Sequence, residues 1–182
     1  MTIIDIKNYQ PTSQDIFIFD SNIWIYLFDN TYIPENYIAR SIDIYTDFYK
    51  KILNTKAKVL ISSFNVKEIS QQFINNDIRN FKLVNPNLDY KKDYRPTQAY
   101  NNLLTHIKSV NQNILKFAEK ISDNFESFDN DLFFNSDIDF VDEYLGFLTE
   151  KNNCKLITHD KDFKKCPFDI DILTANKHLL QV

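Results

Sequence analysis

Four short apolar runs, widely separated along the chain, constrain the fold more than any other feature of the sequence. They are rich in Ile, Val, Leu and Phe, and each has the length of a buried strand. We expect strands at residues 16–19, 58–63, 155–158 and 169–173. Because helical patterns separate these runs, crossover connections must join the strands. This predicts an α/β fold with a mostly parallel central sheet and helices on both faces.

The segments between the runs have the apolar spacing of helices. Helices are expected over residues 22–28, 34–53, 65–81, 99–121 and 139–152, with short ones in 159–165 and 175–180. The second of these should start near Pro34, because proline is favoured in a first helical turn. Prolines interrupt 82–98, and 122–137 is an acidic, turn-rich loop. We therefore expect one domain, 1–182, with a helical elaboration at about 82–138.

Composition excludes several classes of function. The single glycine, Gly146, rules out the glycine-rich loops that bind nucleotide cofactors. The net charge of −4 predicts no general attraction to a polyanion, so a nucleic-acid substrate would require a local reversal of sign. Membrane-length apolar runs and a signal-peptide pattern are lacking, so we expect a cytoplasmic protein with no membrane partner. Cys154 and Cys166 are expected to stay reduced and to pack in the core.

Acidic residues follow the predicted strands. Asp20 directly follows 16–19, Glu68 lies about one helical turn beyond the second strand, and Asp160 lies just past the third. The carboxyl ends of parallel strands meet at one edge of the sheet, where ligands bind, so these three acids should converge there. A fourth acid should come from the helix over 139–152. Asp139 and Asp142 lie three residues apart on one face of it, and either could point into the crevice.

A cluster of carboxylates needs positive charge to be stable. Two unit charges 4 Å apart repel by about 4 kcal/mol at an effective dielectric constant of ~20. Hard divalent cations relieve such repulsion, and ligation by oxygen alone favours Mg²⁺ or Mn²⁺. A metal held in this way can bind phosphate and activate water, so the pattern is typical of metal-dependent phosphodiester cleavage.

Each acid also has a structural interpretation. Asn65 followed by Glu68 fits a capping box, Asp139 fits the N-cap of its helix with Asp142 in the first turn, and Asp20 or Ser21 fits the cap of the first helix. Capping is the more common role of any single such residue. It gives no reason, however, for every acid to lie at the same edge of the sheet.

Four motifs in this order resemble the PIN domain, a metal-dependent ribonuclease fold that includes the VapC-like toxins of toxin–antitoxin pairs. The motifs are IFIFDSNIWIYLF, ISSFNVKEI and VDEYLGFLTEKNNCKLITHDKDF, the last containing two motifs. The resemblance implies a three-layer α/β/α fold and places the third acid at Asp142, with Asp139 in a capping or supporting role. It also implies that Asp20, Asp142 and Asp160 bind Mg²⁺ or Mn²⁺, and that Glu68 binds through water or aligns the nucleophile.

These observations predict a metal-dependent endoribonuclease. Asn22 and Thr158 are expected to orient Asp20 or contact phosphate, and Asp162 to support the site, although each also fits an ordinary cap or loop. The resemblance adds expectations of an RNA substrate, a cognate antitoxin and a homodimer. The alternatives are a PIN-like binding module without strong catalysis and a structure-specific DNA nuclease. The basic and aromatic stretch 90–95 is a candidate substrate contact or an ordinary solvated loop.

Overall fold

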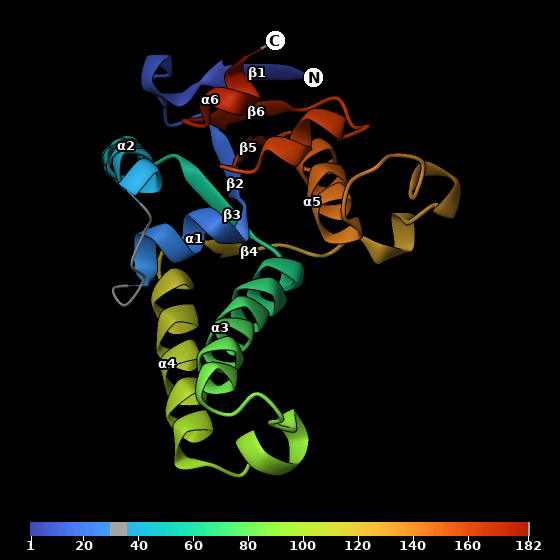
Figure 1. Ribbon diagram of the computed structural model, residues 1–182. Coiled ribbons are helices and arrows are strands. Elements are labelled where there is room, and N and C mark those ends of the chain that lie inside the picture. Colours follow the sequence, from blue (N-terminus) through green and yellow to red (C-terminus); the bar gives the residue numbers. More distant parts are fainter. Residues whose placement is uncertain (30–35, 182) are drawn as a thin grey trace.

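A parallel β-sheet forms the centre of the protein, as the computed structural model in Figure 1 shows; the structure describes residues 1–29 and 36–181. Six strands pair in the order β1-β6-β5-β2-β3-β4, all of them parallel. Their bounds are Thr2–Asp5 (β1), Ile16–Phe19 (β2), Lys58–Ile61 (β3), Glu119–Lys120 (β4), Lys155–Ile157 (β5) and Asp171–Thr174 (β6). The predicted α/β fold with a parallel sheet is confirmed.

Two of these strands were not predicted. β1 and β4 are edge strands, and neither is a long apolar run: β4 consists of two exposed charged residues. The predicted strand over 169–173 begins instead at Asp171, where it pairs with Thr2 and Lys155 on either side. Hydrogen bonding to neighbouring strands, rather than local apolarity, sets these boundaries.

The helices lie close to their predicted positions. They are α1 (Ser21–Phe28), α2 (Asn36–Thr55), α3 (Ser63–Val84), α4 (Gln98–Ile114), α5 (Phe140–Lys151) and α6 (Lys177–Leu180). The predicted start of the second helix near Pro34 falls outside the described residues. α4 ends at Ile114, earlier than the predicted 121, because the chain then turns to pair β4 with β3. No helix in the described ranges is long and apolar enough to cross a membrane.

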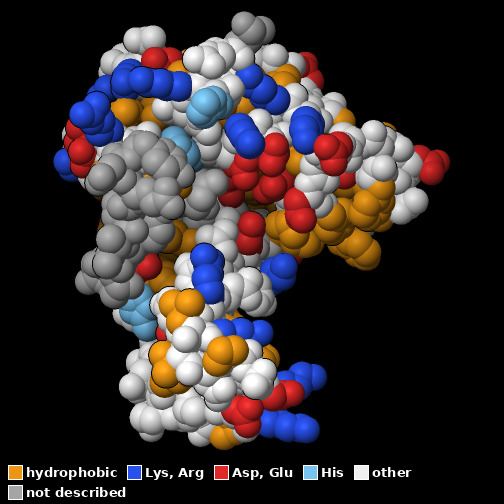
Figure 2. Space-filling view, viewed as in Figure 1, with side chains coloured by type: hydrophobic (Ala, Val, Ile, Leu, Met, Phe, Trp, Pro, Cys, Tyr) orange, Lys and Arg blue, Asp and Glu red, His pale blue; other side chains and the backbone are white. Residues whose placement is uncertain are grey.

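α3 and α4 extend together away from the sheet (Figures 1 and 2). Residues 85–97 join them and contain one π-helical turn, Tyr90–Tyr94. The loop over 122–137 lies beside α5 and contains two short 3₁₀ turns, Phe125–Ser127 and Asn130–Leu132. The segment 82–138 therefore holds the end of α3, all of α4 and this loop.

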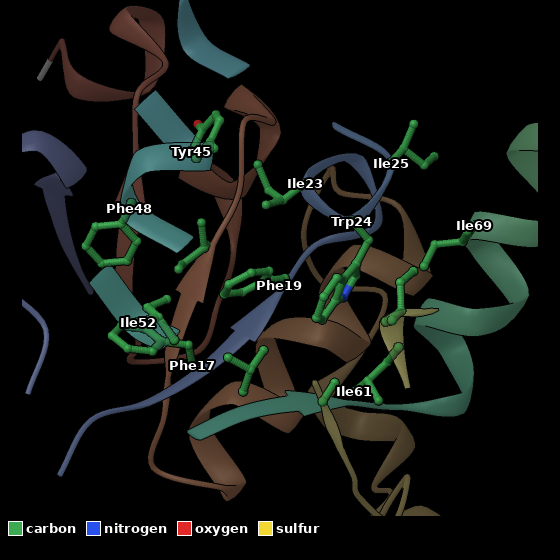
Figure 3. Close-up of a cluster of buried hydrophobic side chains, with 14 of the residues drawn as sticks. Phe17, Phe19, Ile23, Trp24, Ile25, Tyr45, Phe48, Ile52, Ile61 and Ile69 are labelled. Carbon is green, nitrogen blue, oxygen red and sulfur yellow. The ribbon is translucent and has the colours of Figure 1, made fainter. Parts of the chain in front are cut away.

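Alternating side chains of the strands face two separate cores. Phe17 and Phe19 of β2 face a core built with α1, α2, α3 and α4, part of which is drawn in Figure 3. Ile18, between them, faces the opposite core, which includes α5 and α6. This alternation is the period of a strand, and it buries both faces of the sheet. The result is a three-layer α/β/α arrangement.

Both cysteines are free and buried. Cys166 packs against α5 at Gly146: a Cβ atom added to this glycine would lie 2.5 Å from the Cys166 Sγ atom. The close approach of the segment after β5 to α5 therefore requires the only glycine of the chain.

Candidate functional site

Asp20 follows β2 and is almost completely buried, with 2% of its surface exposed. It occupies the N-cap position of α1, but its side chain makes no capping hydrogen bond. Its Oδ2 atom instead accepts hydrogen bonds from Thr158 Oγ1 at 2.6 Å and Asn22 Nδ2 at 2.5 Å, and its Oδ1 atom accepts one from Ser21 Oγ at 3.2 Å. Burial raises the pKa of Asp20, the charge of Asp160 adds to the shift, and the Thr158 and Ser21 hydrogen bonds oppose it. The carboxylate is thus held in place without acting as a cap.

The end of β5 brings Asp160 to the same edge. β5 pairs with β2, and the Asp20 amide donates to the Ile157 carbonyl at 3.0 Å. The Asp160 amide donates to the buried Thr158 Oγ1 at 2.9 Å, and the Asp160 Oδ1 atom accepts from the Asp162 amide at 2.9 Å. The Thr158 hydroxyl therefore links Asp20 to the backbone of Asp160. Asp162 contributes its backbone here, while its side chain lies 3.9 Å from Lys165.

Glu68 lies in the second turn of α3 and is partly buried. The capping box of α3 is formed by Ser62 and Asn65, so the interpretation of Glu68 as its partner residue is wrong. The Asn65 side chain also donates to the Phe19 carbonyl at 3.0 Å, which fixes the start of α3 against the end of β2. Burial and then the charge of Asp20 raise the pKa of Glu68 to about 7, while the neighbouring Ser21 hydroxyl opposes the shift.

The two acids of α5 differ in their surroundings. Asp139 is exposed and caps the helix: its Oδ1 atom accepts from the Val141 amide at 2.9 Å, as predicted for the capping interpretation. Asp142 lies in the first turn and is partly buried, and its pKa is raised to about 8. Burial is the largest cause, followed by the charges of Asp20, Glu68, Asp160 and Asp139. Asp142 therefore lies within electrostatic range of Asp20, Glu68, Asp160 and Asp139.

The carboxyl groups influence one another but are not yet spaced as ligands. In the described parts of the chain, no three His, Cys, Asp or Glu side chains are grouped closely enough to hold a metal ion. The donor chemistry, carboxylate oxygen only, is that of a Mg²⁺ or Mn²⁺ site, but the side chains would have to approach one another to form it.

Acidic side chains gather in a hollow near the middle of the face shown in Figure 2, with Lys and Arg side chains above it. His159, next to Asp160, is partly buried, and burial lowers its pKa. Its Nδ1 atom lies 3.0 Å from the hydroxyl of Tyr45, which also donates to the Thr158 carbonyl at 3.0 Å. The ring of His159 is thus packed against α2.

Sequence patterns did not single out two residues that support the site. The Tyr45 hydroxyl accepts from the Ala175 amide at 2.9 Å, so it also connects β6 to the residues after β5. Glu143 is fully buried and accepts hydrogen bonds from the Phe134 amide at 3.0 Å and the Ser136 hydroxyl at 2.8 Å. This holds the loop before α5 against the helix. The sequence contains one signal for Glu143: it is a carboxylate that directly follows Asp142 in an otherwise apolar stretch.

The stretch 90–95 lies at the tip of the α3 and α4 hairpin, away from the acidic residues (Figure 1). The rings of Tyr90, Tyr94 and Tyr100 pack on one another, and the Arg95 guanidinium lies over two of them, at 5.8 Å from Tyr90 and 5.9 Å from Tyr100. These contacts give the cluster a role in closing the hairpin.

Neither a protein-family model nor a curated protein sequence matches the chain. A solved structure does: the chain is similar to one in the crystal structure of VapBC2 from Rickettsia felis bound to a DNA fragment from their promoter. The TM-score is 0.53 at 16% sequence identity, over 86% of this chain and 96% of that chain. The chain has a PIN-like α/β/α fold. This fold places the ends of β2 and β5 and the starts of α3 and α5, which carry the predicted acids, in one region.

Proposed function

We propose that this protein is a Mg²⁺- or Mn²⁺-dependent endoribonuclease. The observation that carries the proposal is that four acids from separate parts of the fold interact electrostatically. Asp142 is coupled to Asp20, Glu68 and Asp160. Burial and neighbouring charges raise the pKa values of Asp20, Glu68 and Asp142, and such shifts are common at functional sites. The PIN-like fold supports the same reading, because the sequence motifs of that family include these four acids.

In this proposal, Asp20, Asp142 and Asp160 hold the cation, and Glu68 binds it through water or aligns the attacking water. The bound cation supplies positive charge for the scissile phosphate and for the departing oxygen. Asn22 and Thr158 hold the Asp20 carboxylate through their hydrogen bonds, so its orientation is set before substrate binds. Asp139 caps α5 and acts on Asp142 only through its charge.

The sharpest test compares the two acids of α5. Asp142→Asn should nearly abolish cleavage of single-stranded RNA in Mn²⁺ or Mg²⁺, whereas Asp139→Asn should keep most of it, because asparagine also caps helices well. Cleavage is measured on a gel with labelled RNA and with DNA of matched sequence, in either metal or in EDTA. Circular dichroism first establishes that both variants fold.

The reverse ranking of the two variants would move the third acid to Asp139. Cleavage of DNA but not RNA would favour a structure-specific DNA nuclease. If neither substrate is cut under any condition and the folded protein binds no Mn²⁺, the protein is a PIN-like binding module.

We also propose that the protein is the toxin of a toxin–antitoxin pair, because it shares its fold with a chain of VapBC2. Expression alone should then arrest growth, and co-expression of a small protein encoded beside it should restore growth. Expression of the Asp142→Asn variant alone, without the partner, should not arrest growth. Cytoplasmic location and homodimer formation remain predictions.

A further inference from the structure

Two cavities lie next to each other beside the acidic site. The first, of about 380 Å³, is lined by Asn22 and Asp160 of the site, and by Tyr26, Ile38 and Lys161. The second, of about 590 Å³, is lined by residues of α2, α6 and the turn after β1. His159, Asn176 and His178 line both cavities. We call this continuous hollow the lateral groove.

The strand order explains why the groove is continuous. Strands β2, β5, β6 and β1 are neighbours in the sheet, so the residues that follow them lie in a row along its carboxyl edge. Asn22 follows β2, His159 follows β5, Asn176 follows β6 and Lys7 follows β1. Three interstrand steps of ~4.8 Å give a row of about 14 Å from the acidic site to Lys7.

The floor of the groove is fixed by hydrogen bonds. The Asn176 side chain donates to the His159 carbonyl at 2.6 Å and accepts from the His178 amide at 2.9 Å. The Asn22 side chain accepts from the His159 amide at 3.4 Å. These contacts join the turns after three strands, so the lining does not depend on a single loop.

Cations dominate the lining. The exposed side chains of Lys7, Arg40, Lys161 and Lys177 line the groove, and none of them forms an ion pair with any described residue. Asp160, at the end that adjoins the acidic site, is the one carboxylate among its described lining residues. Four unpaired cations on one edge reverse the local sign of a protein whose net charge is −4.

We infer that the lateral groove binds the phosphate backbone of a single-stranded nucleic acid as it leaves the acidic site. The inference rests on the proposed function for the position of the cleaved bond, since it gives the flanking nucleotides a path. Unpaired cations suit the phosphates of a single-stranded nucleic acid. Cavities of a few hundred cubic ångströms fit nucleotides rather than the width of a duplex.

Binding is measured separately from cleavage, by fluorescence anisotropy of a labelled single-stranded RNA in EDTA over a series of salt concentrations. The test variant is Arg40→Gln/Lys177→Gln, which removes two groove cations. The control variant, Lys82→Gln/Lys108→Gln, removes two exposed cations from the α3 and α4 hairpin and changes the net charge equally. Circular dichroism and the thermal midpoint confirm that both variants remain folded.

The groove variant should bind RNA more weakly than wild type, and its plot of log K against log salt should be shallower by about 1.4, since each lost phosphate contact on a single strand removes ~0.7. The control variant should keep the wild-type affinity and slope. Equal losses in the two variants would reduce the effect to net charge and overturn the inference, as would an unchanged groove variant or no binding by wild type.

Different results would overturn the proposed nuclease function and the groove inference. If wild type cleaves RNA but the groove variant binds and cleaves as the control does, the groove inference is overturned and the proposed nuclease remains. If no cleavage occurs in any metal but binding still depends on Arg40 and Lys177, the proposed nuclease fails and the groove inference remains. A single-stranded DNA of the same sequence should give the same ranking of variants, because the groove reads phosphates.

Discussion

Thr158 has no charge, yet its hydroxyl joins two parts of the acidic site. It donates to the Asp20 carboxylate and accepts from the Asp160 amide, so its two hydrogen-bonding directions are both used. Complete burial makes these bonds hard to replace with water. A strand-end threonine thus helps Asn22 and Ser21 to orient the Asp20 carboxylate.

The raised pKa values of Glu68 and Asp142 make stability depend on pH. Unfolded carboxyl groups titrate near ~4, but these two titrate at about 7 and about 8 in the folded protein. Between those limits the native state binds more protons than the unfolded state, so stability is lost as pH rises. We expect the thermal midpoint of wild type in EDTA to be higher at pH 5 than at pH 8.

Asp142→Asn provides the comparison, because an amide does not titrate and also relieves Glu68 of a neighbouring charge. The fall in thermal midpoint between pH 5 and pH 8 should be smaller in this variant than in wild type. Scanning fluorimetry in EDTA measures both. Identical pH dependence in the two proteins would show that Asp142 does not titrate abnormally.

Sequence reasoning located the acids because strand ends are readable from short apolar runs. Asp20 and Asp160 follow such runs directly, and the parallel sheet then places them together. The role of Tyr45 was not readable, since its hydroxyl contacts residues 113 and 130 positions away. The capping box was misassigned because Asn65 can serve either as a cap or as the partner of a cap, and only the start of α3 at Ser63 decides between them.

At the scale of elements, α5 is placed by the absence of a side chain. Gly146 lets the segment after β5 approach this helix, with Cys166 Sγ and the Phe168 ring at 2.5 Å and 3.3 Å from where a Cβ would stand. In an isolated helix, replacing alanine with glycine lowers helix stability by about 1 kcal/mol. In this protein, the close packing around Gly146 outweighs the higher helix propensity of alanine. The same packing fixes the position of α5 and therefore of Asp142.

Gly146→Ala should therefore destabilise the protein, by about 1–3 kcal/mol, as overpacked cores usually do. Cys166→Ala in the same chain should recover much of this loss, because it removes the atom that the new methyl group meets. Urea denaturation of the two single variants and the double variant gives the coupling free energy. A Gly146→Ala protein more stable than wild type would mean that α5 moves freely against this segment.

The two edge strands, β1 and β4, could not be predicted from the sequence. Within the described ranges, β1 pairs only with β6 and β4 only with β3, so each is defined by one neighbour. Glu119 and Lys120 have neither apolarity nor length to mark them as a strand. The central strands are buried on both faces, which makes their sequences apolar and therefore recognisable.

For the molecule as a whole, the acidic site is a stability cost that a cation should remove. Mn²⁺ should raise the thermal midpoint of wild type, since a ligand at 100 times its dissociation constant stabilises the native state by about 2.7 kcal/mol. Asp20→Asn should show a smaller increase, and in EDTA it should be at least as stable as wild type because one repulsive charge is gone. An equal Mn²⁺ effect in both proteins would place the ion elsewhere.

The sheet order also determines when the protein can fold during synthesis. β1 precedes the other described strands along the chain, but among the described residues it pairs with β6, which begins at Asp171, and β5, the other neighbour of β6, ends at Ile157. The nascent chain can assemble β2 and β3 early, whereas the β5 and β6 positions stay empty until residues 155–174 emerge. Contacts this distant in sequence form slowly. Asp160 and three of the four groove cations, Lys7, Lys161 and Lys177, reach their places only when β5 and β6 join the sheet, so a nascent chain completes the acidic site and the lateral groove after β2 and β3 have paired.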